Sequence, residues 1–231
     1  MLYSFDQSQT RRPIRSYVRR EGRITNAQQK ALRTLWPKYG LSHESIIGTN
    51  HFFKNGSALN LEIGFGDGKN LIYLAENNPQ NMYVGIDVYR PGVGGLLIQL
   101  DRLAIENVKI ILGDAIDALP AFFEENSISK VMIYFPDPWP KKRHQKRRLI
   151  RREFLRQIAS YLAKGGELCV STDCENYADD ILSSIEQERL LENVVGSNCY
   201  AIQPFRSLLT KYEARGLSSG KLIRDIHARR L

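Results

Sequence analysis

A glycine-rich turn follows an acidic residue in the first third of the chain. Gly64, Gly66 and Gly68 come directly after a hydrophobic stretch that contains Glu62. Glycine lets the backbone turn tightly and lets a ligand approach without a Cβ atom in the way. A pyrophosphate-binding dinucleotide site would need its third glycine at position 69, where Lys69 stands. We therefore expect a different ligand, and a carboxylate beside the turn favours one that is cationic or rich in hydroxyl groups.

Two further acids have the same relation to a hydrophobic stretch. Asp87 ends the second stretch, 21 residues after Gly66, and Asp114 follows the third. A carboxylate at such a strand end can accept hydrogen bonds from ribose hydroxyls. Each of these acids alone could equally be a turn-forming or helix-capping residue. Their common register with the glycine turn favours a shared ligand site.

A proline-rich loop follows the fourth hydrophobic stretch. Pro136, Pro138 and Pro140 alternate with Asp137 and Trp139. Prolines stiffen a loop, so the acid and the ring between them are held at low entropic cost. A carboxylate can accept N–H bonds from the edge of a planar base while an aromatic ring stacks on its face. The loop therefore predicts a base-binding site.

A basic run begins where this loop ends. Residues 141–152 contain eight Lys or Arg and no acid. The pattern predicts a helix over 145–163 with Arg148, Arg152 and Arg156 on one stripe. Its opposite side would carry the apolar core residues Ile150, Phe154, Ile158 and Tyr161. The basic stripe could be a solvated surface, but beside a base-binding loop it favours contacts to nucleic-acid phosphate.

The elements that must position these residues alternate between strands and helices. The expected strands are 58–63, 82–87, 108–113, 128–135 and 167–172, with two more around 191–197 and 222–228. The expected helices are 25–36, 69–77, 93–105, 115–125, 145–163 and 174–188. Hydrophobic strands that alternate with helices predict an α/β fold with a mostly parallel sheet covered on both faces. Ligands of such sheets bind at the carboxyl ends of the strands, where the acids above are expected.

The net charge of +8 is unevenly distributed along the 231 residues. Residues 1–60 carry +7, residues 61–140 carry −6 and residues 141–231 carry +7. An acidic middle between basic ends suggests a cationic ligand in the middle and a polyanion at the ends. Residues 1–24, which include six arginines between Arg11 and Arg23, predict a mobile basic arm. A mitochondrial targeting peptide is the alternative, although a clear amphipathic face is missing.

The composition excludes several other classes of protein. Hydrophobic residues make up 42% and charged residues 25%, which is typical of a globular domain. The longest apolar runs fall short of the ~20 residues of a membrane span, and we expect a soluble chain without a signal peptide. Cys169, Cys174 and Cys199 form neither a CxxC pair nor a zinc spacing with the four histidines. We expect reduced thiols in a cytoplasmic protein, and no metal.

Together these motifs resemble the bacterial tRNA (guanine-N7-)-methyltransferase (TrmB) family. The segment FPDPWPKKRHQKRR at 135–148 carries the resemblance most specifically. EIGFGDG at 62–68, GIDVYRPGVG at 85–94, GDA at 113–115, STD at 171–173 and TKYE at 210–213 agree with it, and it covers about residues 25–230. The family usually has Glu where Asp87 stands and Phe where Tyr212 stands. Asp87 is therefore the least secure of the acids assigned to the cofactor.

The resemblance implies a Rossmann-like class I methyltransferase fold with a seven-stranded, mostly parallel sheet. It implies one methyltransferase domain over 25–231, with a helical extension over 25–57, that transfers a methyl group from S-adenosyl-L-methionine to N7 of guanine 46 in the variable loop of tRNA. Carried over by position, the cofactor residues are Glu62, Gly64, Gly66, Gly68, Asp87, Asp114 and Asp137, with Asp137 also the catalytic residue. The substrate residues are Lys141, Asp173, Thr210, Lys211, Tyr212 and Glu213. The RNA-binding residues are Lys142, Arg143, Lys146, Arg147, Arg148 and Arg152.

Several alternatives remain open at this point. Asp173 could instead be the N-cap of the 174–188 helix, and 210–213 could be an ordinary loop. Another class I enzyme that methylates a nucleic-acid base would share most of these features. A non-catalytic RNA-binding module with a relic cofactor pocket is less favoured, because all four strand-end acids are intact. The chain could act on tRNA as a monomer or as a homodimer.

Overall fold

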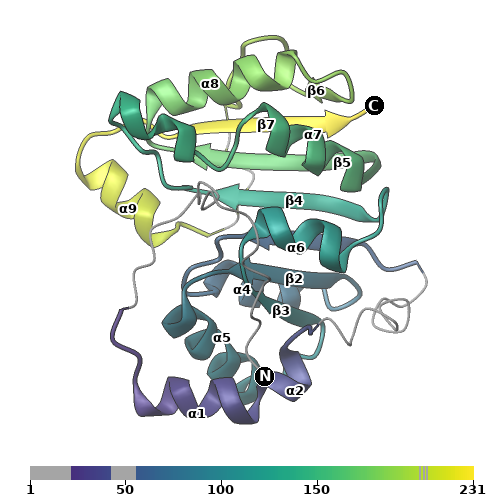
Figure 1. Ribbon diagram of the computed structural model, residues 1–231, viewed down its shortest axis with the longest axis vertical. Coiled ribbons are helices and arrows are strands. Elements are labelled where there is room, and N and C mark those ends of the chain that lie inside the picture. The colour runs from purple at the N-terminus through teal and green to yellow at the C-terminus, as the bar shows by residue number, and fades with distance from the viewer. Residues whose placement is uncertain (1–21, 43–55, 203, 205, 207) are drawn as a thin grey trace, which may run out of the picture.

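The computed structural model describes residues 22–42, 56–202, 204, 206 and 208–231 (Figure 1). Nearly all of the predicted basic arm over 1–24, and part of the predicted extension over 25–57, therefore lie outside the described residues. The strands are β1 (Leu59–Ile63), β2 (Met82–Asp87), β3 (Val108–Leu112), β4 (Ile128–Tyr134), β5 (Leu162–Thr172), β6 (Leu191–Asn193) and β7 (Arg224–Arg230). The helices are α1 (Asn26–Thr34), α2 (Trp36–Tyr39), α4 (Lys69–Asn77), α5 (Arg90–Arg102), α6 (Ala115–Phe122), α7 (Arg152–Tyr161), α8 (Glu175–Glu186) and α9 (Lys211–Ser218), with a 3₁₀ helix η2 (Lys142–Arg147).

The strands form one seven-stranded sheet in the order β3-β2-β1-β4-β5-β7-β6. The strands from β1 to β5 pair in parallel, and β7 runs antiparallel to both of its neighbours, β5 and β6. The chain builds the sheet outward from β1 to β3 and then returns to place β4 on the other side of β1. A ligand crevice is expected at this reversal, at the carboxyl ends of β1 and β4. The predicted seven-stranded, mostly parallel α/β sheet is confirmed.

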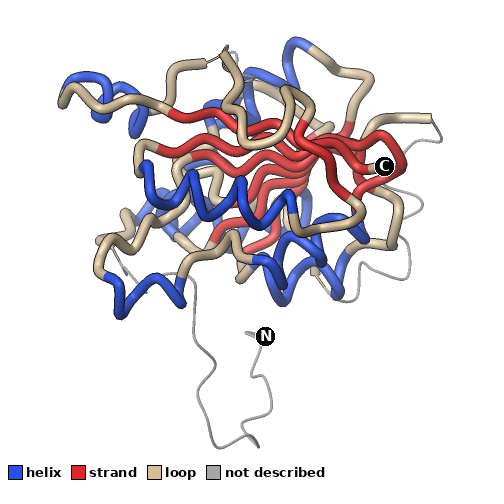
Figure 2. The backbone as a smooth tube through the Cα atoms, turned by 90° about the horizontal axis from the view of Figure 1, so that it is seen from above, coloured by secondary structure: helices blue, strands red, loops and turns tan. Residues whose placement is uncertain are grey.

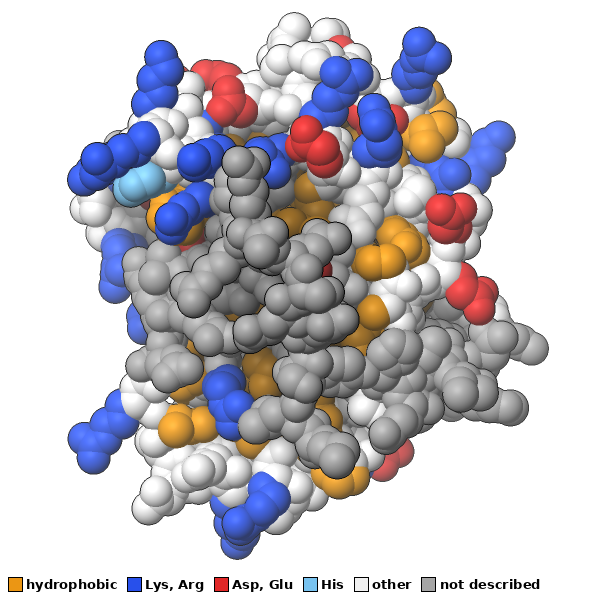
Figure 3. All heavy atoms as spheres, viewed as in Figure 1, with side chains coloured by type: hydrophobic (Ala, Val, Ile, Leu, Met, Phe, Trp, Pro, Cys, Tyr) orange, Lys and Arg blue, Asp and Glu red, His pale blue; other side chains and the backbone are white. Residues whose placement is uncertain are grey.

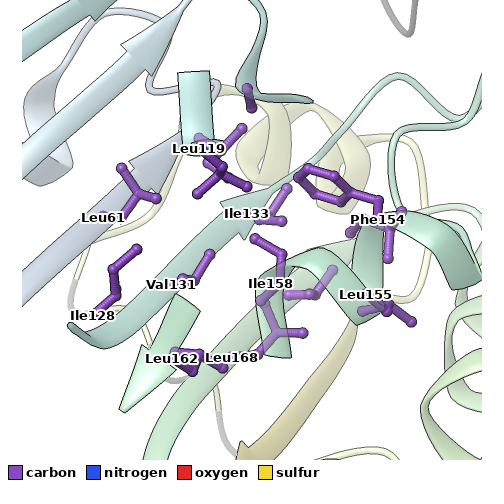
Figure 4. Close-up of a cluster of buried hydrophobic side chains, with 14 of the residues drawn as sticks. Leu61, Leu119, Ile128, Val131, Ile133, Phe154, Leu155, Ile158, Leu162 and Leu168 are labelled. Carbon is purple, nitrogen blue, oxygen red and sulfur yellow. The ribbon is translucent and has the colours of Figure 1, made fainter. Parts of the chain in front are cut away.

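Helices cover both faces of the sheet (Figure 2). On one face, the apolar side chains of β1, β4 and β5 pack against α6, α7 and α8, as Figure 4 shows for Leu61, Val131, Leu119 and Ile158. On the other face, α1, α4 and α5 pack against β2 and β3 in a second apolar cluster. Successive residues of a strand point to opposite faces, so both clusters draw on β2.

The extension before the sheet begins with a helix that has a complete cap. Thr25 and Gln28 form a capping box at the start of α1, as expected from their types and spacing. Pro37 lies in the first turn of α2 instead of merely ending α1, because a proline fits there without losing a hydrogen bond. Gly94 of α5 lets α1 approach closely, since a Cβ at that position would lie 2.8 Å from the backbone oxygen of Gln28.

The largest departure from the predicted elements lies in the basic run. The predicted helix over 145–163 is wrong: η2 ends at Arg147, α7 begins only at Arg152, and β5 already begins at Leu162. Between the two helices the chain turns inward and buries Arg148 and Ile150. Like charges spaced four apart also disfavour one continuous helix here. Among the described helices, none has both the length and the apolar content that a bilayer crossing requires.

Gly68 is the position where the glycine turn meets the helix layer, and it yields the first testable prediction. Its φ is +74°, and a Cβ there would lie 2.6 Å from the Cδ1 atom of the fully buried Leu96. We expect Gly68→Ala to lower the free energy of unfolding by about 2–4 kcal/mol, from backbone strain plus overpacking. The measurement is urea unfolding.

Gly220→Ala is the matched control for this variant. Gly220 has a φ of +71° but open space where its Cβ would lie, so only backbone strain of about 1 kcal/mol is expected. Equal losses in the two variants would contradict a steric role for the contact between Gly68 and Leu96.

Candidate active site

Glu62 is a buried carboxylate next to the glycine turn. It lies in β1 with 4% of its surface exposed, and the side-chain amide of Asn70 in α4 donates a hydrogen bond of 3.0 Å to it. Burial raises the pKa of Glu62 to about 8, although the bond from Asn70 opposes this shift. A buried carboxyl group with one neutral partner is well suited to meet a cationic ligand.

The backbone of the glycine turn leaves room for such a ligand. Gly64 and Gly66 have φ values of +76° and +60°, a conformation that side chains with a Cβ rarely adopt. Among the described residues, only chain neighbours come within 4 Å of where a Cβ would lie at either position, so this part of the structure leaves the space beside the turn open. Gly64 and Gly66 thus leave room for a ligand, whereas Gly68 leaves room for the side chain of Leu96.

Asp87 ties the end of β2 to the glycine turn. Its two carboxylate oxygens accept hydrogen bonds from the backbone N–H groups of Gly66, at 2.9 Å, and Tyr89, at 2.8 Å. Burial is the main cause that raises the pKa of Asp87, and these backbone bonds oppose the rise. Asp87 therefore has the turn-forming role that was the alternative to ligand binding. Each carboxylate oxygen still keeps a second lone pair that a ligand hydroxyl could use.

Asp114 caps the helix that follows β3. Its side chain accepts the backbone N–H of Ile116 at 3.1 Å and begins α6. The capping role considered for this acid is therefore present in the structure. The contact with the adenine end of a cofactor remains a prediction.

The loop after β4 presents Asp137 at the surface. Phe135 and Trp139 on either side of it have φ values of +53° and +43°, which is strained backbone for residues with bulky side chains. Such strain persists only where the surroundings hold the chain, and it clusters at functional sites. The N–H of Phe135 donates to the carbonyl of Ser171 at 2.8 Å, so the first residue of the loop is bonded to the end of β5. The exposed Asp137 is held on a strained, anchored loop.

Trp139 has protein partners of its own. Its ring meets the ring of His144 edge-on, with centroids 5.8 Å apart, and the guanidinium of Arg147 lies 5.0 Å from its centroid. These contacts bind the proline-rich loop to η2. Stacking of an aromatic ring on a base remains a prediction, and one face of this ring is already taken by Arg147.

Most of the predicted RNA-binding residues are exposed on η2 and at the start of α7. They are Lys142, Arg143, Lys146, Arg147 and Arg152, and Lys141, a predicted substrate residue, is exposed beside them. Figure 3 shows several Lys and Arg side chains gathered at the upper left of this face. This arrangement is open to a polyanion.

Arg148 is the exception, because the structure buries it instead of exposing it. Its side chain is 3% exposed, and its guanidinium is bonded to Pro138, Asn176 and Asp180. The predicted stripe of Arg148, Arg152 and Arg156 is absent, because α7 begins only at Arg152. Arg156 lies 3.8 Å from a carboxylate oxygen of Glu188.

The remaining predicted substrate residues lie where β5 ends and α9 begins (Figure 1). Asp173 does not cap α8, whose N-cap is Cys174, and instead pairs with Lys221 at 2.5 Å. Residues 210–213 are not an ordinary loop. Thr210 and Glu213 form the capping box of α9. Lys211 and Tyr212 are exposed on the same turn and remain free to meet a substrate.

A buried arginine connects these substrate residues to the loop of Asp137. Arg206 donates to Glu213 at 2.6 Å and to the hydroxyl of Ser171 at 2.7 Å, and it also pairs with Asp225. Its guanidinium lies 5.7 Å from the ring centroid of Phe135. Sequence reasoning missed Arg206 because its neighbours give no periodic signal and its partners lie up to 35 residues away.

A cavity of about 180 Å³ lies between α4 and the sheet. Its lining includes Asn70, the partner of Glu62, and also Tyr134 and Arg206. It therefore lies between the partner of Glu62 and the buried Arg206.

One grouping of possible metal ligands occurs among the described residues. Glu167, Cys169 and His227 place their ligand atoms within 4.8 Å of one another on β5 and β7. The ammonium of Lys130 lies 2.8 Å from Glu167, and burial raises the pKa of the Cys169 thiol to about 12. Lys130 already neutralises the carboxylate and the thiol is protonated, so we assign no metal to this cluster.

The fold and the strand-end residues define a class I methyltransferase: a mostly parallel sheet, a glycine turn after β1, and acids at the ends of β1 to β3. Solved structures agree on the fold. The antibiotic-resistance methyltransferase Kmr matches with a TM-score of 0.56 and 13% identity, over 83% of this chain and 94% of that one. The aminoglycoside resistance methyltransferase NpmB1 matches with a TM-score of 0.54 and 16% identity over the same shares.

Sequence comparisons identify the family within this class. The family model described as "Putative methyltransferase" matches residues 57–226. A tRNA (guanine-N(7)-)-methyltransferase from Alkalilimnicola ehrlichii is 41% identical over 97% of this chain and 96% of its own length. One from Methylobacillus flagellatus is 43% identical, over 95% and 92% respectively. The chain belongs to the tRNA (guanine-N(7)-)-methyltransferase family.

The raised pKa of Glu62 predicts a pH-dependent stability. The folded protein keeps a proton on Glu62 at pH values where the unfolded chain, with a pKa of 4.5, has lost it. The contribution of Glu62 to stability is therefore complete below about pH 4.5 and is lost as the pH rises through about 8. We expect Glu62→Gln to flatten the fall in unfolding free energy over this range, measured by urea unfolding without cofactor.

Glu192→Gln, at an exposed carboxylate on β6, is the control and should keep the wild-type pH dependence. The assignment to Glu62 fails if Glu62→Gln keeps that dependence as well.

The Arg206 cluster predicts a large loss of stability on removal of one partner. Arg206→Met leaves the carboxylates of Glu213 and Asp225, each 9% exposed, without their counter-ion. We expect the free energy of unfolding to fall by about 3–5 kcal/mol. Lys221→Met removes the partner of Asp173 from a pair in which the lysine is 54% exposed, and should cost about 0–1 kcal/mol. Similar small losses in both variants, in denaturant titrations, would refute a central role for Arg206.

Proposed function

We propose that this chain transfers the methyl group of S-adenosyl-L-methionine to N7 of guanine 46 in the variable loop of tRNA, forming 7-methylguanosine. The observation that carries the proposal is the near full-length identity of about 40% to relatives of that name. The geometry supports it, because Asp137 is exposed on the loop that follows β4, next to the crevice of β1.

The crevice residues fit this cofactor. A sulfonium and an amino group are cationic, and the crevice offers the buried carboxylate of Glu62 beside the open space at Gly64 and Gly66. Asp87 and Asp114 would hold the ribose and the adenine end. When bound, the cofactor supplies an electrophilic methyl group. A positive charge near Glu62 would lower the pKa of that carboxyl and favour its ionised form.

The proposed reaction requires little acid–base catalysis by the protein. Guanine N7 is an acceptor whose lone pair lies in the base plane, so no proton has to be removed before attack. We propose that Asp137 orients the guanine and stabilises the positive charge that forms on the methylated base. Lys141, Asp173 and residues 210–213 would hold the substrate from the side of α9.

The basic surface would hold the tRNA by its phosphates. Contacts from Lys142, Arg143, Lys146, Arg147 and Arg152 give affinity and register without reading the sequence. N7 is hidden in the deep major groove of an RNA helix, so the target guanine has to lie in a loop or be exposed by the protein. The free cysteines of the described chain favour the reducing cytoplasm as the site of action, with the protein acting as a monomer or a homodimer.

Asp137→Asn tests this mechanism. Wild-type protein, labelled S-adenosylmethionine and unmodified tRNA should yield labelled 7-methylguanosine on nucleoside analysis. The variant keeps the shape of the side chain but loses its charge, and we expect kcat to fall by about 10²-fold or more. Glu192→Gln, at the far edge of the sheet, should leave kcat unchanged.

Two outcomes count against the proposal. Label in a product other than 7-methylguanosine would overturn the function itself. Near-normal turnover of Asp137→Asn would overturn the electrostatic role of Asp137 and leave the reaction intact.

A further inference from the structure

One member of the basic run points inward, away from any RNA. Arg148 lies between η2 and α7, where the basic residues Arg147, Arg151 and Arg152 are exposed, yet its side chain is 3% exposed. Its Nε donates to the carbonyl of Pro138 at 2.9 Å, and its Nη2 donates to Asn176 at 3.0 Å. Its Nη1 is paired with Asp180. The guanidinium is thus bonded to the proline-rich loop on one side and to α8 on the other.

The packing around this guanidinium is also specific. Its central carbon lies 4.7 Å from the ring centroid of Tyr177, which is fully buried in α8. The hydroxyl of Tyr177 accepts the backbone N–H of Ile150 at 2.9 Å. A planar guanidinium that stacks on a ring and bonds along its edge is held in one orientation, which a lysine could not reproduce.

Arg148 bonds the carbonyl group of Pro138, the residue that follows Asp137. The carbonyl of Pro138 lies between Phe135 and Trp139, the two residues with strained backbone. Strain of this kind costs of the order of 1–3 kcal/mol at each residue and needs outside contacts to persist. The bond from Arg148 is such a contact, and it fixes the backbone on the C-terminal side of Asp137.

We infer that Arg148 is a positioning residue: it fastens the loop that carries Asp137 to α8 and does not bind RNA phosphate. The inference rests on the proposed function, because the loop matters through the role of Asp137. To contact RNA, Arg148 would have to break its bonds to Pro138, Asn176 and Asp180 and leave the ring of Tyr177. The exposed Arg152 shows the contrasting arrangement, with a side chain open to solvent.

Two variants weaken this anchor from opposite sides. Arg148→Lys keeps the positive charge of the basic run but cannot bond Pro138, Asn176 and Asp180 together. Asp180→Asn leaves every basic residue in place and weakens the anchor from α8. The side chain of Asp180 is 53% exposed, so we expect this variant to fold even where Arg148→Lys does not. Arg152→Gln reports on a true phosphate contact, and Arg189→Gln, at an exposed arginine after α8, is the control.

Three measurements are made on each variant: steady-state kinetics, which give kcat and KM for tRNA, the slope of log Kd for tRNA against log salt concentration, and the melting temperature. We expect Arg148→Lys and Asp180→Asn to lower kcat by about 10- to 100-fold, as displacement of a reacting group does. Their salt slope should stay at the wild-type value. Arg152→Gln should reduce the slope by about 0.9. Arg189→Gln should match the wild type in all three measurements.

Three results would overturn the inference. The first is an unchanged kcat in both Arg148→Lys and Asp180→Asn, because the position of Asp137 would then not depend on the anchor. The second is tighter tRNA binding in Asp180→Asn without loss of kcat, because that variant would have released an RNA-binding arginine. The third is a loss of kcat that is absent when the variants are assayed well below their melting temperatures. Such a loss would come from unfolding and not from a displaced Asp137. An inactive wild-type protein would instead refute the proposed function, so the two failures are distinguishable.

Discussion

The pairing of β4 with β1 is the constraint on which the whole site depends. In this pair Glu62 lies opposite Met132, and both strands end at the same edge of the sheet. The glycine turn leaves one strand there, and the proline-rich loop leaves the other. Parallel neighbours at the point where the chain reverses direction place the two loops at the same edge of the sheet. The buried acid and the exposed acid are thus brought together by backbone hydrogen bonds in the sheet.

Burial gives the acids of the site different properties. Glu62 and Asp87 are both enclosed, and burial raises both pKa values. Asp87 is bonded to two backbone N–H groups, whereas Glu62 meets a single neutral amide. Asp87 is therefore a structural part of the turn as well as a candidate ligand. Glu62 has a single neutral donor among the described residues, so its environment is the one that a cation would change most.

The sequence allowed the sheet and the strand-end acids to be predicted, because both depend on local patterns. The bounds of β2 and α4 agree with the prediction, since a continuous hydrophobic run and a following proline mark them. Failures occurred where a side chain has distant partners. Arg148 has helical spacing from Arg152, but Asp180, 32 residues away, decides its orientation. Arg206 gave no signal at all, because the residues that surround it come from β5, β7 and α9. Periodicity says which face of an element is apolar, and it cannot say which arginine is buried by ion pairing.

The two buried arginines act on opposite ends of one strained loop. Arg206 lies under the ring of Phe135, and Arg148 bonds the carbonyl of Pro138, so Asp137 lies between the two points of attachment. Neither guanidinium reaches solvent, and each is neutralised by carboxylates from elements later in the chain. Burying a charge is costly unless its hydrogen bonds are satisfied, and arginine can satisfy several planar acceptors at once. The strained loop is therefore stable only after β5, α8 and α9 have assembled around it. Asp137 acquires its defined position from elements that follow it in the chain, although the strand β1 beside β4 comes before it.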